Sequence, residues 1–163
     1  MNRRAALLAG CSSGLLVLAG CASPGLASRA GADAWSGRLS LRLEGDASQS
    51  FSALFELRGA PRAGELILTS PIGSTLAQLH WAPGEAVLRN GSETRRYDSV
   101  DALIEAATGA AIPVGALFAW LAGRDERVPG WRPDLSQVTA GRLQATRESP
   151  APRADLRIVF ERA

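Results

Sequence analysis

The chain has 163 residues, of which 46% are hydrophobic and 21% are charged, with 17 Gly and 9 Pro. This length and composition predict one globular domain and exclude wholesale disorder and collagen-like repeats. All 18 basic residues are Arg, and one His and two Cys are too few for a His/Cys zinc site or a disulfide framework. We therefore expect no metal and no cofactor.

Residues 1–20 have the features of a bacterial export signal. Arg3 and Arg4 give a positive start, and a mainly apolar run follows from Ala5 to Gly20. This run is shorter than the about 20 apolar residues that a membrane-spanning helix needs, so it predicts a cleaved signal peptide. It ends in Leu-Ala-Gly-Cys at Cys21, which resembles the lipobox of bacterial lipoproteins. That resemblance implies lipidation of Cys21 and cleavage just before it.

Two alternatives to lipidation at Cys21 stay open. A second Leu-Ala-Gly-Cys ends at Cys11 after a much shorter apolar stretch, and a secreted protein could be cut elsewhere. We favour Cys21, which leaves 143 residues with 16 Arg and 16 acidic residues. A formal charge of zero gives no general excess of positive charge for nucleic acid. Because Ala22 rather than Asp follows the Cys, the lipoprotein resemblance implies the outer membrane, with the protein facing the periplasm.

The rest of the chain begins with a tether and continues as strands. Residues 21–32 are rich in Ala, Ser, Gly and Pro, which predicts a flexible link. Beyond it, apolar and polar residues alternate, as in strands with one buried face. Turn signals between the runs, the strongest at Asn90-Gly91, predict an antiparallel meander. The six expected strands cover residues 37–43, 51–57, 64–69, 75–81, 86–89 and 93–97.

The hydrophobic period then becomes helical. Apolar residues three and four apart predict one helix from Asp98 or Ser99 to Gly109 and a second from Pro113 to Gly123. A polar loop is expected at residues 124–133, and further strands at residues 135–140, 143–147 and 155–161. The expected fold class is α+β. A meander this long must curl, close or be covered, and two amphipathic helices can cover one mouth of a curled sheet.

The link between the third and fourth strands carries an unusual residue. Residues 68–75 read LTSPIGST, in which Pro71 and Gly73 suit a turn. Ile72 between them is apolar, although a loop tip normally faces water. Either Ile72 folds back onto the core, or it inserts into a membrane or a partner. Burying such a side chain contributes about 1.5–3 kcal/mol, enough to orient a protein already tethered by lipid but too little to anchor one.

Four features, taken in order, resemble the LolB family of outer-membrane lipoprotein receptors. LTSPIGST is similar to the family segment L-T-x-P-L-G-S-T, where x is Ser, Thr or Asn. The lipobox at Cys21 agrees, and GRLSLR followed by FSALFEL is similar to the first hairpin of the family. PVGALFAWLAG, from Pro113 to Gly123, is similar to its helix I-P-x-x-x-L-x-x-W-L-x-G. The resemblance covers about residues 35–147.

The resemblance implies a fold and a function for residues 33–163. The fold is an incomplete antiparallel barrel whose helices cover a hydrophobic cavity. The function is to accept lipoproteins from a soluble, LolA-like periplasmic carrier, hold their acyl chains, and release them into the inner leaflet of the outer membrane without nucleotide. The expected partners are the carrier, the cargo acyl chains and outer-membrane phospholipid, with no nucleic acid, and we expect a monomer.

The resemblance also assigns candidate residues. A Leu of the family that assists membrane delivery falls on Ile72, so Pro71, Ile72 and Gly73 form the expected membrane-inserting loop. An acyl-chain carrier needs an apolar concavity, although each of its lining residues could equally be ordinary core. The candidate lining residues are Leu41, Phe51, Phe55, Leu66, Leu68, Leu79, Trp81, Leu117, Trp120 and Leu121.

Two other classes of protein compete with this interpretation. A lipid hydrolase needs a Ser–His–acid set, but His80 is the only His, it lies within an expected strand, and no G-x-S-x-G occurs. Asp125-Glu126 is better explained as a solvated turn, so we assign no catalytic residue and expect no enzyme. A structural outer-membrane lipoprotein that binds protein partners in an envelope assembly is the alternative. A filled core rather than an apolar cavity would favour it.

Overall fold

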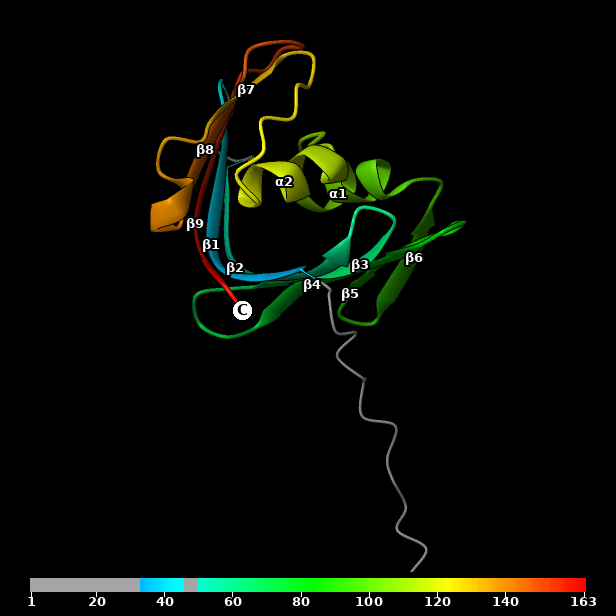
Figure 1. The fold of residues 1–163 in the computed structure, drawn as a ribbon. Helices are drawn as coiled ribbons and strands as arrows, with labels where there is room; N and C mark the ends of the chain where they lie inside the picture. The colour runs from blue at the N-terminus through cyan, green and yellow to red at the C-terminus, as the bar shows by residue number, and fades with distance from the viewer. Residues whose placement is uncertain (1–32, 46–49) are drawn as a thin grey trace, which may run out of the picture.

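A computed structural model describes residues 33–45 and 50–163 (Figure 1). The expected signal peptide (1–20), Cys21 and the tether (21–32) lie outside the described residues. One antiparallel sheet holds nine strands, in the order β6-β5-β4-β3-β2-β1-β9-β8-β7. The strands are β1 (Asp33–Leu43), β2 (Phe51–Ala60), β3 (Ala63–Thr69), β4 (Thr75–Ala82), β5 (Glu85–Asn90), β6 (Glu93–Tyr97), β7 (Trp131–Asp134), β8 (Arg142–Arg147) and β9 (Ala154–Arg162).

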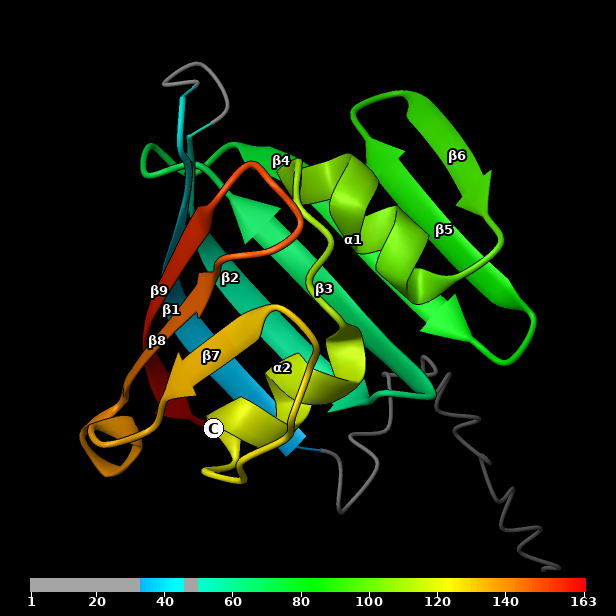
Figure 2. The ribbon, with the colours of Figure 1, turned by 90° about the horizontal axis from the view of Figure 1, so that it is seen from above.

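The sheet curls without closing. Strands β6 and β7 stand at its two ends and are not paired with each other. Figures 1 and 2 show one wing made of β1, β9, β8 and β7 and another made of β3 to β6, with helices α1 and α2 lying on the concave side between the wings. The expected α+β class, an incomplete antiparallel barrel covered by helices, is therefore confirmed.

Alternation along each strand separates the two faces of the sheet. In β1, Leu39 and Leu41 are buried on the concave face, whereas Arg38 is exposed on the convex face. The register places Leu39 opposite Ala53 of β2 and Ile158 of β9, which are both buried. Because cross-strand partners share a face, neighbouring strands contribute their apolar residues to a single core.

Two short helices cover this core. Helix α1 covers Val100–Thr108 and helix α2 covers Val114–Leu121. The backbone N–H of Ala102 donates to the Ser99 hydroxyl oxygen at 3.1 Å, which caps α1, and Gly109 ends the helix with a left-handed φ of 77°. The N–H of Val114 donates to the Asp101 carboxylate at 2.9 Å. The first turn of α1 therefore also caps α2 and fixes the angle between the helices.

Helix α2 is buried on nearly all sides, with Gly115 as its one exposed residue. On one side, Phe118 packs against the sheet. On another, the rings of Trp120 and Trp131 of β7 lie 6.0 Å apart. The helix is thus held between the concave face and the last strand of the wing. Neither it nor any other helix in residues 33–45 and 50–163 is long and apolar enough to cross a membrane.

The expected strand at residues 135–140 is wrong. The strand instead lies earlier, at β7, inside the expected polar loop. The Asp134 carboxylate accepts a hydrogen bond from the N–H of Ser136 at 3.0 Å and turns the chain. A 3₁₀ turn, η2 (Val138–Ala140), follows and ends at Gly141 with a φ of 72°. The turns at Asp134 and Gly141 thus prevent a strand at residues 135–140 despite the weak apolar–polar alternation there. The strand forms instead where Trp131 is buried.

Candidate functional site

The link between β3 and β4 is a tight, internally hydrogen-bonded loop. The N–H of Gly73 donates to the carbonyl oxygen of Ser70 at 2.9 Å, and the N–H of Ser70 donates to the carbonyl of Ser74 at 2.8 Å. The N–H of Ser74 also donates to the Ser70 hydroxyl at 3.0 Å. Gly73 has a φ of 91°, which favours glycine at this position. Three hydrogen bonds therefore fix the tip of the loop.

The loop presents Ile72 to solvent. Its side chain is 90% exposed, more than that of Leu54 (36%) or Val159 (58%), the other exposed large apolar residues in the described part of the chain. Pro71 and Gly73 are exposed as well. The alternative in which Ile72 folds back onto the core is therefore wrong. A hydrogen-bonded loop therefore holds an apolar side chain out in solvent.

The ten candidate cavity residues all lie on the concave side and belong to one cluster. Nine are buried, and Phe51 is partly buried and packs against the others. The indole N–H of Trp81 donates to the carbonyl of Ala60 at 3.1 Å, and that of Trp120 donates to the carbonyl of Glu126 at 2.9 Å. The candidates are thus brought together, with both of these indole donors satisfied.

Phe118 of α2 fills the space between these residues. Its ring meets the Trp35 ring edge-on at 5.5 Å and the Trp81 ring edge-on at 6.3 Å. Phe118 and Trp35 are 2% and 1% exposed and complete the site, although neither is among the candidates that the sequence suggested. Trp35 could have been found, because it continues the alternation of Leu39 and Leu41 toward the N-terminus. Its indole N–H is buried and has no partner in the described residues.

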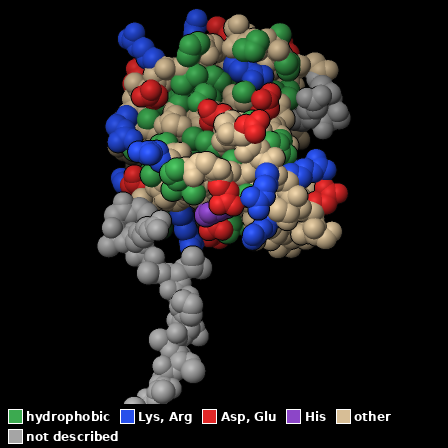
Figure 3. All heavy atoms as spheres, turned by 90° about the vertical axis from the view of Figure 1, so that its right-hand side faces the viewer, with side chains coloured by type: hydrophobic (Ala, Val, Ile, Leu, Met, Phe, Trp, Pro, Cys, Tyr) green, Lys and Arg blue, Asp and Glu red, His purple; other side chains and the backbone are tan. Residues whose placement is uncertain are grey.

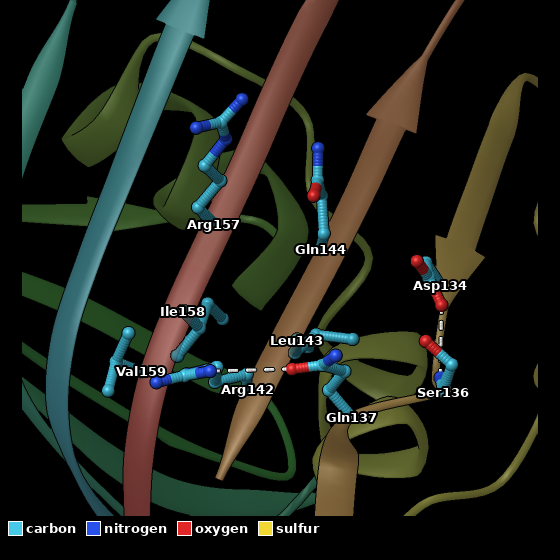
Figure 4. Close-up of a pocket in the computed structure, with 9 residues that line it drawn as sticks. All are labelled: Asp134, Ser136, Gln137, Arg142, Leu143, Gln144, Arg157, Ile158 and Val159. Atoms are coloured by element: carbon cyan, nitrogen blue, oxygen red, sulfur yellow. Dashed lines mark hydrogen bonds between the residues drawn. The ribbon is translucent and has the colours of Figure 1, made fainter. Parts of the chain in front are cut away.

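A groove of about 370 Å³ lies elsewhere, on the convex side of the sheet (Figure 4). It runs between the end of β7 with the link that follows it and strands β8 and β9. The residues that line it are Asp134, Ser136, Gln137, Arg142, Leu143, Gln144, Arg157, Ile158 and Val159. The concave side is therefore occupied by packed side chains, whereas this groove opens to solvent.

Charged side chains of both signs are spread over the surface. Figure 3 shows Arg and acidic groups interspersed on one side of the molecule, with His80 among them. The Arg95 guanidinium donates a hydrogen bond to the Glu93 carboxylate at 2.8 Å, and this contact raises the pKa of Arg95. Hydrogen bonds from Ser136 lower the pKa of the Asp134 carboxyl. Within residues 33–45 and 50–163, no three His, Cys, Asp or Glu residues gather as a metal site would require.

Comparison with known families finds one family that matches most of the described residues. The model of the family described as "Outer membrane lipoprotein LolB" matches residues 33–160, from the start of β1 nearly to the end of β9. The chain belongs to the LolB family. The family match includes both helices, the Ile72 loop and every candidate cavity residue.

Several relatives named "Outer-membrane lipoprotein LolB" are similar to this chain. A protein from Bordetella petrii is 38% identical over 114 residues, which cover 66% of this chain and 57% of the relative. One from Cupriavidus pinatubonensis is 35% identical over 152 residues, covering 87% and 70%. One from Chromobacterium violaceum is 34% identical over 131 residues, covering 76% and 69%. The chain thus spans a little over half the length of the Bordetella relative.

Proposed function

We propose that this LolB-family protein is an outer-membrane receptor for lipoproteins. It is anchored by lipid at Cys21 and faces the periplasm. It accepts lipoproteins from a LolA-like soluble carrier, holds their acyl chains against its apolar concave side, and inserts them into the inner leaflet of the outer membrane. The exposure of Ile72 on a hydrogen-bonded loop is the observation that carries the proposal, together with the family.

Acyl chains need room that packed side chains now occupy. Phe118 lies between Trp35 and Trp81, so α2 must shift away from the sheet before a chain can enter. Each buried CH₂ of the chain then contributes about 0.8 kcal/mol, while the displaced contacts of α2 are lost. Because the loss of the α2 contacts offsets part of the gain from burying the acyl chain, the affinity for the chain stays moderate. A receptor that must release its cargo benefits from such a balance, because a site that held the chain too tightly would retain it.

The loop acts at the release step. Ile72 can contribute about 1.5–3 kcal/mol when it enters the acyl region of a membrane. That is enough to orient a domain that a lipid anchor already holds near the surface. Because the loop is fixed by its own hydrogen bonds, little ordering opposes insertion.

Transfer from a loaded carrier tests both steps. The protein is prepared from Ala22 onward, without its anchor, and mixed with the carrier bearing a radiolabelled lipoprotein. Label should move to this protein without ATP and then to liposomes. Ile72→Glu should accept label normally and deliver it poorly, because an ionised carboxylate does not enter hydrocarbon. Ile72→Leu should deliver normally, and Thr75→Glu, which places the same charge at the base of the loop, should deliver nearly as well.

The filled concave side favours one alternative, a structural outer-membrane lipoprotein that binds protein partners. Failure of a folded protein to take label from an active carrier would reject the receptor proposal and support that alternative. Equal delivery by Ile72→Glu and Ile72→Leu would reject the role of the loop while leaving acceptance intact.

A further inference from the structure

Three Arg side chains on the convex face have no part in the proposed function so far. Arg38 on β1, Arg142 on β8 and Arg157 on β9 are exposed, on the side of the sheet away from the helices. The register pairs Val159 of β9 with Arg38 on one side and with Arg142 on the other. Val159 is 58% exposed. We call Arg38, Arg142, Arg157 and Val159 the outer-face patch.

The outer-face patch borders the groove of about 370 Å³ (Figure 4). Arg142 and Arg157 line the groove together with Gln137, Gln144 and the Asp134 carboxylate, so two guanidinium groups border a space open to solvent. Figure 4 shows these two Arg side chains at different points along the groove rather than aimed at one spot. The Arg142 guanidinium makes one long contact, 3.4 Å, with the Gln137 side-chain oxygen. Donors of this kind in a shallow polar groove are suited to phosphate oxygens.

The positive charge of the outer-face patch is not neutralised by close ion pairs. The ion pairs in the described part of the chain involve four other Arg residues, not Arg38, Arg142 or Arg157. Four carboxylates lie nearby on the same face, including that of Glu56 on β2, which forms an ion pair with Arg58. Asp134 accepts a hydrogen bond from Ser136, Asp155 accepts one from Thr146 at 3.1 Å, and Glu161 follows farther along β9. None of the four forms a close ion pair with an Arg of the patch in the described residues.

The outer-face patch and the Ile72 loop lie toward the same side of the molecule. Figures 1 and 2 both show the loop between β3 and β4 and the η2 segment at the left, the side toward which the outer face of β9 also points. A flat surface that touches the loop can therefore also approach the patch. A protein partner would need a surface shaped to contact both the Ile72 loop and the outer-face patch. A bilayer can contact both without any specific shape.

We propose that the outer-face patch binds the phosphate groups of anionic phospholipid, so that the patch and the Ile72 loop together lay the protein on the membrane. This inference rests on the proposed function, because it assumes a protein anchored at a bilayer. Each Arg close to an anionic surface strengthens binding about fivefold, so three strengthen it about a hundredfold. Val159, at the centre of the row, adds apolar contact at the level of the head groups.

Fluorescence quenching in vesicles tests the orientation. The mature, lipidated protein carries Ser40→Cys, labelled with a dye, on the outer face of β1 opposite Arg157. It is reconstituted in vesicles of phosphatidylethanolamine with either phosphatidylglycerol or phosphatidylcholine, each with spin-labelled lipid. Quenching should be strong with phosphatidylglycerol and weak with phosphatidylcholine. A dye at Ala106→Cys, on the exposed side of α1, should be quenched weakly in both.

Variants and salt separate the patch from overall charge. Replacing Arg38, Arg142 and Arg157 with Glu should abolish the lipid-dependent quenching at position 40. The same change at Arg62, Arg124 and Arg127, which are also exposed, should preserve most of it. High salt should weaken quenching of the unmodified patch, which tests the idea without any substitution that could affect folding.

Several outcomes would overturn the inference. They are equal quenching in both lipids, quenching that salt does not weaken, or equal loss in the two triple variants. Protection of position 40 by the carrier rather than by lipid would also overturn it and point to an acidic protein partner. The readout needs no cargo, so a failure here is distinct from a failure of lipoprotein transfer.

Discussion

Replacing Phe118 by Ala tests whether the concave side is filled in solution. Phe118 is 2% exposed, and its ring meets two Trp rings edge-on at 5.5 and 6.3 Å. Removing a buried Phe side chain costs about 3–5 kcal/mol. The two aromatic pairs account for about 1–3 kcal/mol of that loss. Because single domains are stable by only about 5–15 kcal/mol, the variant should be much less stable but still largely folded in the cold.

Equilibrium unfolding in urea measures this loss. The four Trp residues of the chain, Trp35, Trp81, Trp120 and Trp131, are all buried and report unfolding by fluorescence. Phe118→Leu refills most of the space and should lose clearly less stability than Phe118→Ala. The Ala variant should also bind an apolar dye more tightly than the parent. A loss below about 1 kcal/mol would refute the reasoning, because α2 would then not hold Phe118 against the sheet.

Two further predictions concern the backbone and pH. Gly130 has a φ of 82°, and a Cβ added there would collide with the carbonyl oxygen of Ser149, whereas Gly84 has a similar φ of 78° and open space around it. Gly130→Ala should therefore lower the thermal unfolding temperature more than Gly84→Ala does, and equal decreases would contradict the close contact. Ser136→Ala should raise the pKa of Asp134 toward its ordinary value in an NMR titration, because the hydroxyl is the main cause of its lowering. Because the pKa of Asp134 is lower in the folded state, the stability linked to this carboxyl is fully present above the unfolded-state pKa and is lost as pH falls through the folded-state pKa. An unchanged Asp134 titration in Ser136→Ala would contradict the role of the Ser136 hydroxyl.

Most of the fold follows from local patterns. Alternation placed β1 to β6, β8 and β9, and helical spacing with Ser99 and Gly109 placed α1. The sequence pattern failed where tertiary contacts decide. Trp131 lies among polar residues, yet its packing on Trp120 and its pairing with Arg147 make a strand there. No local pattern reveals a ring partner that lies in another element.

The candidate site divides in the same way. Ile72 could be singled out because an apolar residue between Pro71 and Gly73 is chemically unexpected, but its exposure depends on how Ser70 and Ser74 close the loop. The strand residues among the cavity candidates share one buried face, since period two fixes the face of each strand residue, whereas their role as an acyl-chain site stays a prediction. Phe118 was missed as the residue that fills their centre, because a helical stripe gives the buried side of α2 but not the partner at each position.

The position of β9 has a consequence for how the chain reaches its final form. The last strand does not add to a margin of the sheet; it lies between β1 and β8 and joins the two wings. Leu41 of β1 must meet Leu156, more than a hundred residues later in the chain. Such a long closure is slow to form. During synthesis the β1–β6 half can assemble first, but the two wings stay unjoined until β9 has emerged. Loss of β9 would therefore separate the two wings of the sheet rather than shorten one margin.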